Sequence, residues 1–265
     1  MSISLETLKM SIYLPPRDLI YGVQGIGKST LASQMEKPVF LAAEDGLSGL
    51  PGIQHWEIRS FPDAIEAITA LHDDHPFKSV VLDTVSAFEP MLHRQLLDNW
   101  QVDSIDKVGA NGGGFYKWRT EALPLWQDIL DGLDSLRINK GMRIILIGHS
   151  IDKEVKPPES DPYRKYTVDL LNDKASALLY RWADVVGFCN YKISVTGTTR
   201  DKRGKVTKAG RAIGSGERVM YLSERPAFFA KNRFDLPSEI PLTCKDYLEA
   251  FHQNNNQNTG EQENG

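Results

Sequence analysis

Cysteine is scarce in this chain of 265 residues, which contains only Cys189 and Cys244. The two lie far apart in sequence, and neither belongs to a C-x-x-C pair or to a Cys/His group with the spacing of metal ligands. A disulfide framework and a zinc site are therefore not indicated. We interpret both residues as plain thiols, buried or half-buried.

Long apolar runs and excess positive charge are missing as well. No uninterrupted apolar segment is long enough to span a bilayer, and the N-terminus lacks the charged-then-apolar pattern of a secretory signal. We therefore expect a cytoplasmic protein that does not bind membranes. The formal net charge of −4 excludes a surface that is basic all over. Any binding of nucleic acid must be confined to a local basic patch.

Apolar runs alternate along the chain with segments of helical spacing, and 41% of the residues are hydrophobic. This alternation predicts one large α/β domain with a mostly parallel sheet flanked by helices. We expect strands at 19–21, 39–42, 79–82, 143–147 and 184–189. We expect helices at 63–73, 87–100 and 118–136.

The last third of the sequence has a different character. Short apolar runs at 185–195, 218–222 and 227–230 are joined by turns rich in Gly, Thr and charge, which predicts antiparallel additions to the same sheet. From residue 253 onward the chain is Asn, Gln, Glu and Gly without an apolar anchor. The expected organisation is one domain over 1–252 and a disordered tail over 253–265.

One motif carries most of the functional information. It fits the pattern G-x-x-x-x-G-K-[ST] at every fixed position and reads Gly22, Val23, Gln24, Gly25, Ile26, Gly27, Lys28, Ser29, Thr30. It follows an expected strand and begins an expected helix, which is the context that a phosphate-binding loop requires. The alternative is an ordinary glycine-rich turn with a solvated lysine.

Glycine matters in this loop, here called the phosphate loop, because its amides can turn toward one phosphate only where no Cβ obstructs the chain. The start of the following helix adds unpaired N–H groups. Lys28 is expected to reach the β- and γ-phosphates, and the Ser29 hydroxyl is expected to bind Mg²⁺. The predicted cofactors are ATP and Mg²⁺.

Asp83 ends the apolar run that starts at Ser79, and this has the form of a Walker B strand. A carboxylate there lies at the carboxyl edge of the sheet, where ligands of open α/β sheets collect. We expect Asp83 to hold Mg²⁺, mainly through water. The alternative is a structural Asp that caps or turns the chain.

Two further polar residues follow expected strands. Glu44 comes after the strand at 39–42 and can polarise a water for attack on the γ-phosphate, although a solvated loop acid is an equal alternative. Asp45 is the substitute if the register differs by one residue. His149 follows the strand at 143–147, where it can touch the γ-phosphate and report hydrolysis, or can be a plain strand-end histidine.

Together, the phosphate loop, Glu44, Asp83 and His149 resemble the RecA-type branch of P-loop ATPases. The string Ala230-Lys231-Asn232-Arg233-Phe234 resembles the Lys-x-Arg element of the RadA-type and DnaB-type members. The whole of 19–242 looks most similar to compact phage-encoded RecA-like ATPases linked to single-strand annealing and recombination. It departs from full recombinases because it shows no N-terminal domain, zinc module or separate DNA-binding domain.

The resemblance implies a fold, an assembly and partners. The fold is the RecA-like P-loop NTPase fold, and the assembly is a homo-oligomeric ring or filament. In it, Lys231 and Arg233 reach a neighbour's nucleotide site and stabilise charge there. The implied partners are single-stranded DNA and a recombination or single-strand-binding protein, in the host cytoplasm if the chain is phage-encoded.

Three basic segments are candidates for binding DNA. In the resembled family, long loops after the sheet hold single-stranded DNA, and here 102–115 and 150–167 are expected to be such loops. The run at 192–211 is strongly basic, and phosphate contact and a solvated hairpin are equal alternatives for it. Trp118 is expected in the core. The candidate residues are Lys117, Arg119, Lys153, Lys156, Arg164, Lys165, Arg200, Lys202, Arg203 and Lys205.

The sequence thus predicts a Mg²⁺-dependent ATPase that is stimulated by DNA and acts on single-stranded DNA in recombination, annealing or repair. One alternative is a module that binds ATP as an assembly switch without turning it over. Another is a small-molecule kinase, which would usually carry an Arg-rich lid over the phosphates.

Overall fold

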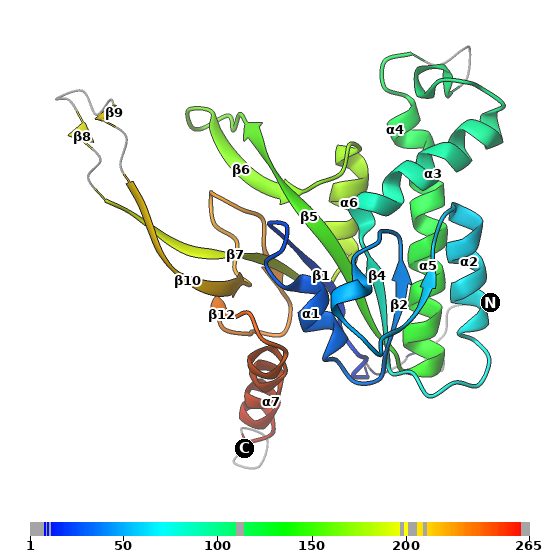
Figure 1. The fold of residues 1–265 in the computed structure, drawn as a ribbon, viewed down its shortest axis with the longest axis horizontal. Helices are drawn as coiled ribbons and strands as arrows, with labels where there is room; N and C mark the ends of the chain where they lie inside the picture. The colour runs from blue at the N-terminus through cyan, green and yellow to red at the C-terminus, as the bar shows by residue number, and fades with distance from the viewer. Residues whose placement is uncertain are drawn as a thin grey trace.

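The computed structural model describes residues 8, 10, 12–109, 114–196, 199–200, 206–208 and 211–260. Its main sheet has the strand order β12-β10-β7-β1-β5-β4-β2-β3, and β6 and β11 pair beside β5 and β7 (Figure 1). The strands are β1 (Arg17–Gly22), β2 (Pro38–Ala42), β3 (Gln54–Glu57), β4 (Ser79–Asp83), β5 (Arg143–Val155), β6 (Tyr163–Val168), β7 (Val185–Thr196), β10 (Arg211–Tyr221), β11 (Lys231–Asn232) and β12 (Glu239–Pro241).

The centre of the sheet is parallel. Strands β1, β2, β3, β4, β5 and the start of β7 run in one direction. Strands β6, β10 and β11 run in the opposite direction, and β12 pairs antiparallel with β10. The short apolar runs of the sequence become strands that are buried on both faces, as in β4. The expected fold class, a mostly parallel sheet flanked by helices with antiparallel C-terminal strands, is confirmed.

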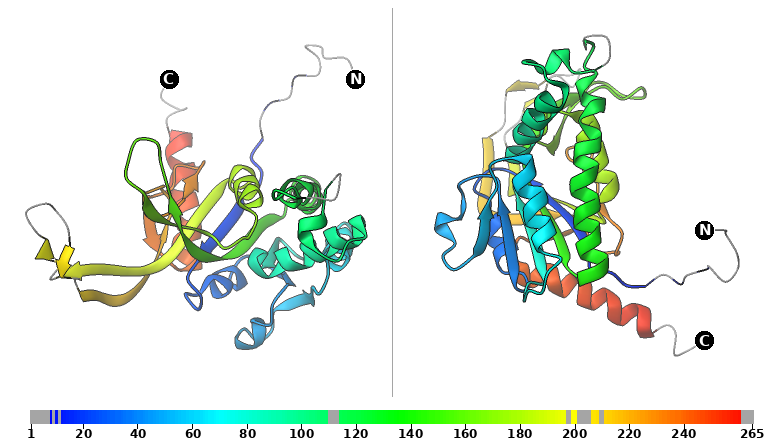
Figure 2. Two further views of the ribbon diagram at one scale, coloured as in Figure 1. Left: turned by 90° about the horizontal axis from the view of Figure 1, so that it is seen from above. Right: turned by 90° about the vertical axis from the view of Figure 1, so that its right-hand side faces the viewer.

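Helices cover the two faces of the sheet unequally. The larger core cluster holds residues of α2 (Phe61–Ala70), α3 (Val85–Trp100), α5 (Leu123–Lys140) and α6 (Asp173–Trp182). The smaller cluster, on the other face, holds residues of α1 (Lys28–Ser33) and α7 (Cys244–Gly260). Figure 2 shows α7, in red, extending away from the body of the protein.

Local sequence signals set the helix ends. The Ser60 hydroxyl accepts a hydrogen bond from the Asp63 amide at the start of α2, and Thr84 does the same for Ala87 at the start of α3. The expected helix at 118–136 divides into α4 (Trp118–Glu121) and α5, because Pro124 lacks an N–H and occupies the first turn of α5. Trp118 is 3% exposed, so its predicted core role is confirmed.

Two hairpins extend beyond the body of the protein (Figure 1). One is made by the far half of β5 and by β6, so the loop predicted at 150–167 is wrong over most of its length. The other, the β7–β10 arm, pairs Tyr191 with Arg218 near its base and Thr196 with Arg211 farther out. Near the tip of the arm lie β8 (Thr199–Arg200) and β9 (Val206–Lys208).

Other expectations near the C-terminus differ from the structure. The strand predicted at 227–230 is wrong, since Phe228 makes only isolated bridges there. Helix α7 continues to Gly260, whereas the sequence predicts disorder from Gln253, and residues 261–265 lie outside the described part. Nothing in the Asn/Gln-rich segment before Gly260 is a strong helix breaker, so the helix that starts at Cys244 can propagate through it.

A buried polar cluster fixes α7 to the sheet. Asp18 of β1 is fully buried and accepts hydrogen bonds from Arg143 Nε at 2.6 Å and from the Tyr247 hydroxyl at 2.8 Å. The Arg143 guanidinium also lies over the rings of Tyr247 and Phe251. Burial alone would lower the pKa of Arg143, but the Asp18 carboxylate more than offsets this and the pKa is raised. The C-terminal helix is therefore attached through a buried charge pair.

None of the helices in the described residues is both long and apolar enough to cross a membrane.

Candidate nucleotide-binding site

The phosphate loop connects β1 to α1 at the carboxyl edge of the sheet. Gly25 and Gly27 have φ angles of 71° and 109°, which an L side chain rarely adopts. A Cβ on Gly22 would lie 2.1 Å from the Cys189 carbonyl oxygen, so only glycine fits where β1 passes β7. Because α1 has only six residues, the amides of the loop contribute more to an anion site than a helix dipole does.

Lys28 is 5% exposed and lies inside the curve of the loop. Its Nζ donates hydrogen bonds to the carbonyls of Gly22 at 3.1 Å and Val23 at 3.0 Å. Burial lowers the pKa of Lys28, and the nearby carboxylates of Asp83 and Glu44 oppose that effect. The ammonium group is thus held at the position where a bound anion would meet it.

Asp83, at the end of β4, is 3% exposed, and the neighbouring Ser29 side chain opposes the effect of burial on its pKa. Its Oδ1 is buried and has no hydrogen-bond partner among the described residues. Burial raises the pKa of Asp83. An orphaned carboxylate oxygen beside a serine hydroxyl fits the oxygen ligands that Mg²⁺ takes.

A group of three or more His, Cys, Asp or Glu side chains able to hold a metal does not occur among the residues that the structure describes. This agrees with the donor set at Asp83 and Ser29, since Mg²⁺ is commonly bound by one or two protein groups together with substrate phosphates and water. These residues therefore do not form a site in which protein side chains alone hold a metal.

Glu44 lies next to this pair and contacts two other residues. Its Oε2 is 3.2 Å from His149 Nε2 and accepts a hydrogen bond from the Thr84 hydroxyl at 3.4 Å. The side chains of Glu44 and His149 are 35% and 27% exposed, so both reach solvent. Asp45, the substitute considered from the sequence, is exposed.

The register of the sheet explains why residues far apart in sequence meet here. Gly22 pairs with His149 on β5 and with Cys189 on β7, and Ala42 pairs with Asp83. Each predicted site residue of the strands therefore leaves the sheet at the same edge. The fold brings Lys28, Ser29, Glu44, Asp83 and His149 together at this edge.

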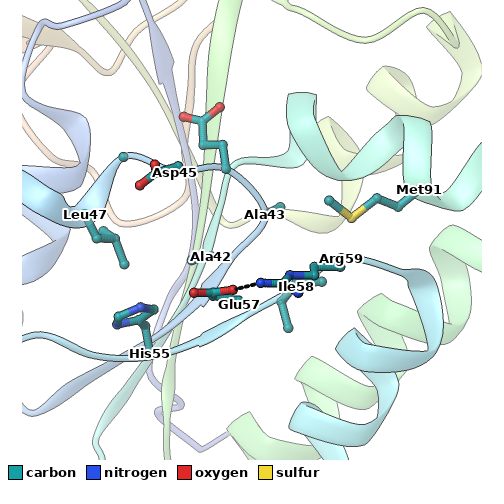
Figure 3. A pocket seen from close by; sticks show the side chains of 11 residues that line it. Ala42, Ala43, Asp45, Leu47, His55, Glu57, Ile58, Arg59 and Met91 are labelled. Carbon is teal, nitrogen blue, oxygen red and sulfur yellow. Dashed lines mark hydrogen bonds and ion pairs between the residues drawn. The ribbon is translucent and has the colours of Figure 1, made fainter.

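A cavity of about 550 Å³ opens beside Glu44 (Figure 3). Its floor is apolar, with Ala42 and Ile58, and its rim carries the Glu57–Arg59 ion pair and His55. These rim residues come from edge strand β3 and the residues directly after it, which the sequence analysis missed because β3 is short and its side chains are all exposed. The cavity leaves room for solvent or a partner next to Glu44.

Lys231 and Arg233 lie away from the phosphate loop of their own chain. Strand β11 pairs with the start of β7, at the amino edge of the sheet. Lys231 Nζ donates to three carbonyls at the end of α6 at 2.9, 3.1 and 2.6 Å. Arg233 pairs with Asp184 at 3.1 Å while its side chain stays 52% exposed. Within one chain, Lys231 caps α6, and Arg233 is the more accessible of the two.

Most of the described DNA-binding candidates form ion pairs within the chain. Arg119 and Lys153 both pair with Asp173, Lys156 pairs with Glu154, Arg164 with Asp152 and Lys165 with Glu224. Lys117 is exposed. Paired acids from β5, α6 and the following segments reduce the positive potential that a basic composition alone suggests.

The basic run on the arm is described only in part. The Arg200 side chain and all of Lys202, Arg203 and Lys205 lie outside the described residues. The sequence analysis missed Arg218 on β10, whose Nη1 donates to the Ile26 carbonyl in the phosphate loop at 3.3 Å. No local motif marks Arg218, since only the pairing of β10 with β7 brings it to the loop.

Comparison with known proteins finds a matching family model. A family model described as an AAA domain matches residues 15–234. The chain is also 26% identical over 238 residues to the SPbeta prophage-derived uncharacterized protein YorG of Bacillus subtilis (strain 168), and the match covers 87% of this chain. It covers 63% of that relative, so the chain spans less than two thirds of the relative's length.

Among solved structures, the crystal structure of the RadB recombinase is similar to 88% of this chain over 90% of its own. The TM-score is 0.47 and the sequence identity is 13%.

Proposed function

The chain belongs to the family of AAA domains that its residues 15–234 match, and from this premise we propose that it is a Mg²⁺-dependent ATPase acting on single-stranded DNA. The likeness to a prophage-derived protein supports a phage-encoded origin. Recombination, annealing or repair is the proposed setting, as the resemblance to RecA-like ATPases implies.

The observation that carries the proposal is the convergence of five side chains at one edge of the sheet. Lys28 and Ser29 come from the phosphate loop, and Glu44, Asp83 and His149 follow β2, β4 and the first half of β5. A glycine-rich turn with a structural lysine would not need a buried carboxylate with an orphaned oxygen beside it. The convergence supports phosphate chemistry over the plain turn.

Each residue has a proposed role. The loop amides and Lys28 bind the phosphates, and Ser29 and Asp83 hold Mg²⁺, which neutralises charge on the phosphates when it is bound. Glu44 accepts a proton from the attacking water. His149, 3.2 Å from Glu44, orients that carboxylate and links it to β5. Protein groups thus position the water and compensate charge.

The direct test is phosphate release from ATP by the unchanged protein, with and without single-stranded DNA, together with its molecular mass in ATP. We expect Mg²⁺-dependent release that rises with DNA, and a mass several times that of one chain. Assembly in ATP without any phosphate release would instead identify an ATP-controlled switch. A phosphorylated metabolite in place of free phosphate would identify a kinase.

The trans role proposed for Arg233 can be tested by mixing two inactive variants. Arg233→Ala has an intact nucleotide site without the finger, and Lys28→Ala has the finger without a working site. If Arg233 acts on the neighbour, the mixture should recover a measurable part of the activity, because some sites then combine both intact halves. Arginine fingers contribute about 10³–10⁵-fold to turnover.

Lys231 is unsuitable for this mixing test because it also caps α6. Arg181→Ala, a change at an exposed residue of the same region, is the matched control and should retain activity alone. A mixture no more active than its components would place Arg233 outside the mechanism.

A further inference from the structure

Arg218 lies against the phosphate loop of its own chain, although the two are far apart in the sequence. It sits on β10 opposite Tyr191 of β7, just beyond the point where Cys189 of β7 pairs with Gly22. Its Nη1 is 3.3 Å from the Ile26 carbonyl oxygen. A Cβ on Gly27 would lie 2.8 Å from the same nitrogen, so the glycine of the motif leaves the space that this guanidinium fills.

An irregularity in the backbone before Arg218 sets the direction of its side chain. The register between β10 and β7 shifts between Gly214 and Arg218, and Gly216 has a φ of 77°. Bulges of this kind redirect a side chain and often occur next to active sites. The Arg218 carbonyl accepts a hydrogen bond from the Leu242 amide at 3.0 Å, which fixes the strand directly after the bulge.

The charge of Arg218 is not neutralised by the described part of the chain. Its side chain is exposed, and no carboxylate among the described residues lies within ion-pair distance of it. Lys192, the neighbouring cation on the arm, is paired with Glu239 at 2.7 Å. Of the five N–H donors of a guanidinium, one contacts a loop carbonyl, and a carbonyl does not compensate a full charge.

We propose that Arg218 is a phosphate-binding residue that contacts the nucleotide held by the phosphate loop of the same chain. This deepens the function proposed above and rests on it. A guanidinium binds phosphate oxygens through charged hydrogen bonds, and this one lies beside the loop that is proposed to hold the phosphates. Because Arg218 belongs to the base of the β7–β10 arm, the nucleotide is then bound from both β1 and the arm.

The test measures ATP and ADP affinity by calorimetry in the full chain with Mg²⁺ for three variants. Arg218→Lys keeps the charge, Arg218→Gln keeps a donor for the Ile26 carbonyl without the charge, and Arg218→Ala keeps neither. We expect the Gln and Ala variants to bind ATP about tenfold more weakly or worse, as the loss of one charged hydrogen bond implies, and Lys to retain most of the affinity. Arg94→Ala, at an exposed residue of α3, should bind as the unchanged protein does.

The outcomes separate a ligand contact from a brace for the loop. If Arg218→Gln binds ATP as well as Arg218→Lys, the residue only supports the loop and the proposal is overturned. Unchanged affinity in Arg218→Ala overturns it as well. Thermal melting without nucleotide should be the same for all the variants. If the unchanged protein binds no ATP, the function proposed above fails, whereas normal binding with no effect at Arg218 rejects this inference alone.

Discussion

Glu44→Gln is expected to lower the rate of ATP hydrolysis by about 10²–10⁴-fold, the usual contribution of a positioned general base. The amide has nearly the same shape as the carboxylate but cannot take a proton from water. Glu44 is not part of the phosphate loop, so ATP affinity should stay close to that of the unchanged protein. Single-turnover phosphate release and equilibrium binding of ATP would measure the two effects separately.

Two other variants complete this experiment. Asp45→Asn changes the exposed carboxylate next in sequence and should leave turnover intact, which shows that the effect depends on position rather than on local charge. Lys28→Ala removes the buried ammonium and should abolish both turnover and tight ATP binding. Equal turnover in Glu44→Gln and in the unchanged protein would remove Glu44 from the mechanism.

Asp18→Asn is expected to lower the free energy of unfolding by about 3–5 kcal/mol, the usual effect of removing one partner from a buried ion pair. The substitution leaves the Arg143 guanidinium, whose side chain is 12% exposed, without its carboxylate. Urea unfolding followed by circular dichroism would measure the change. Because Tyr247 shares the same carboxylate, the attachment of α7 should weaken first and show earlier hydrogen exchange.

A double variant separates the charge pair from its surroundings. Arg143→Met removes the charge and keeps an apolar stem, so Asp18→Asn combined with Arg143→Met should be destabilised by less than the sum of the two single changes. Simple additivity of the three values would mean that the pair does not act as a unit. Lys245→Ala, on the exposed side of α7, should change stability little.

Most of the site was predictable because its signals are local. The phosphate loop is a contiguous motif, and Glu44, Asp83 and His149 each follow an apolar run. Parallel strands bring their carboxyl ends to one edge, so the residue after each run is placed without knowledge of the strand order. The sequence left open whether Glu44 is a solvated acid, and its proximity to His149 comes only from the pairing of β2 with β4 and of β4 with β5.

The features that were missed depend on distant pairings. Strand β5 continues past His149 into a hairpin because Ser150 pairs with Val168. The mixed polar sequence of this segment contains no pattern that predicts the pairing. The acids that pair with Lys153 and Lys165 are Asp173 and Glu224, which lie in later segments of the chain. Arg218 reaches the loop through two strand pairings and a bulge. Composition predicts charges, but only the fold decides which of them are paired.

Strand β5 connects the projecting hairpin to the candidate site. On one side of His149 it is held between β1 and β4, and on the other side it belongs to the projecting hairpin with β6. Because one strand runs through both regions, its backbone links the hairpin directly to His149. A displacement of the hairpin near Val155 would therefore reach the residue that lies within hydrogen-bond distance of Glu44.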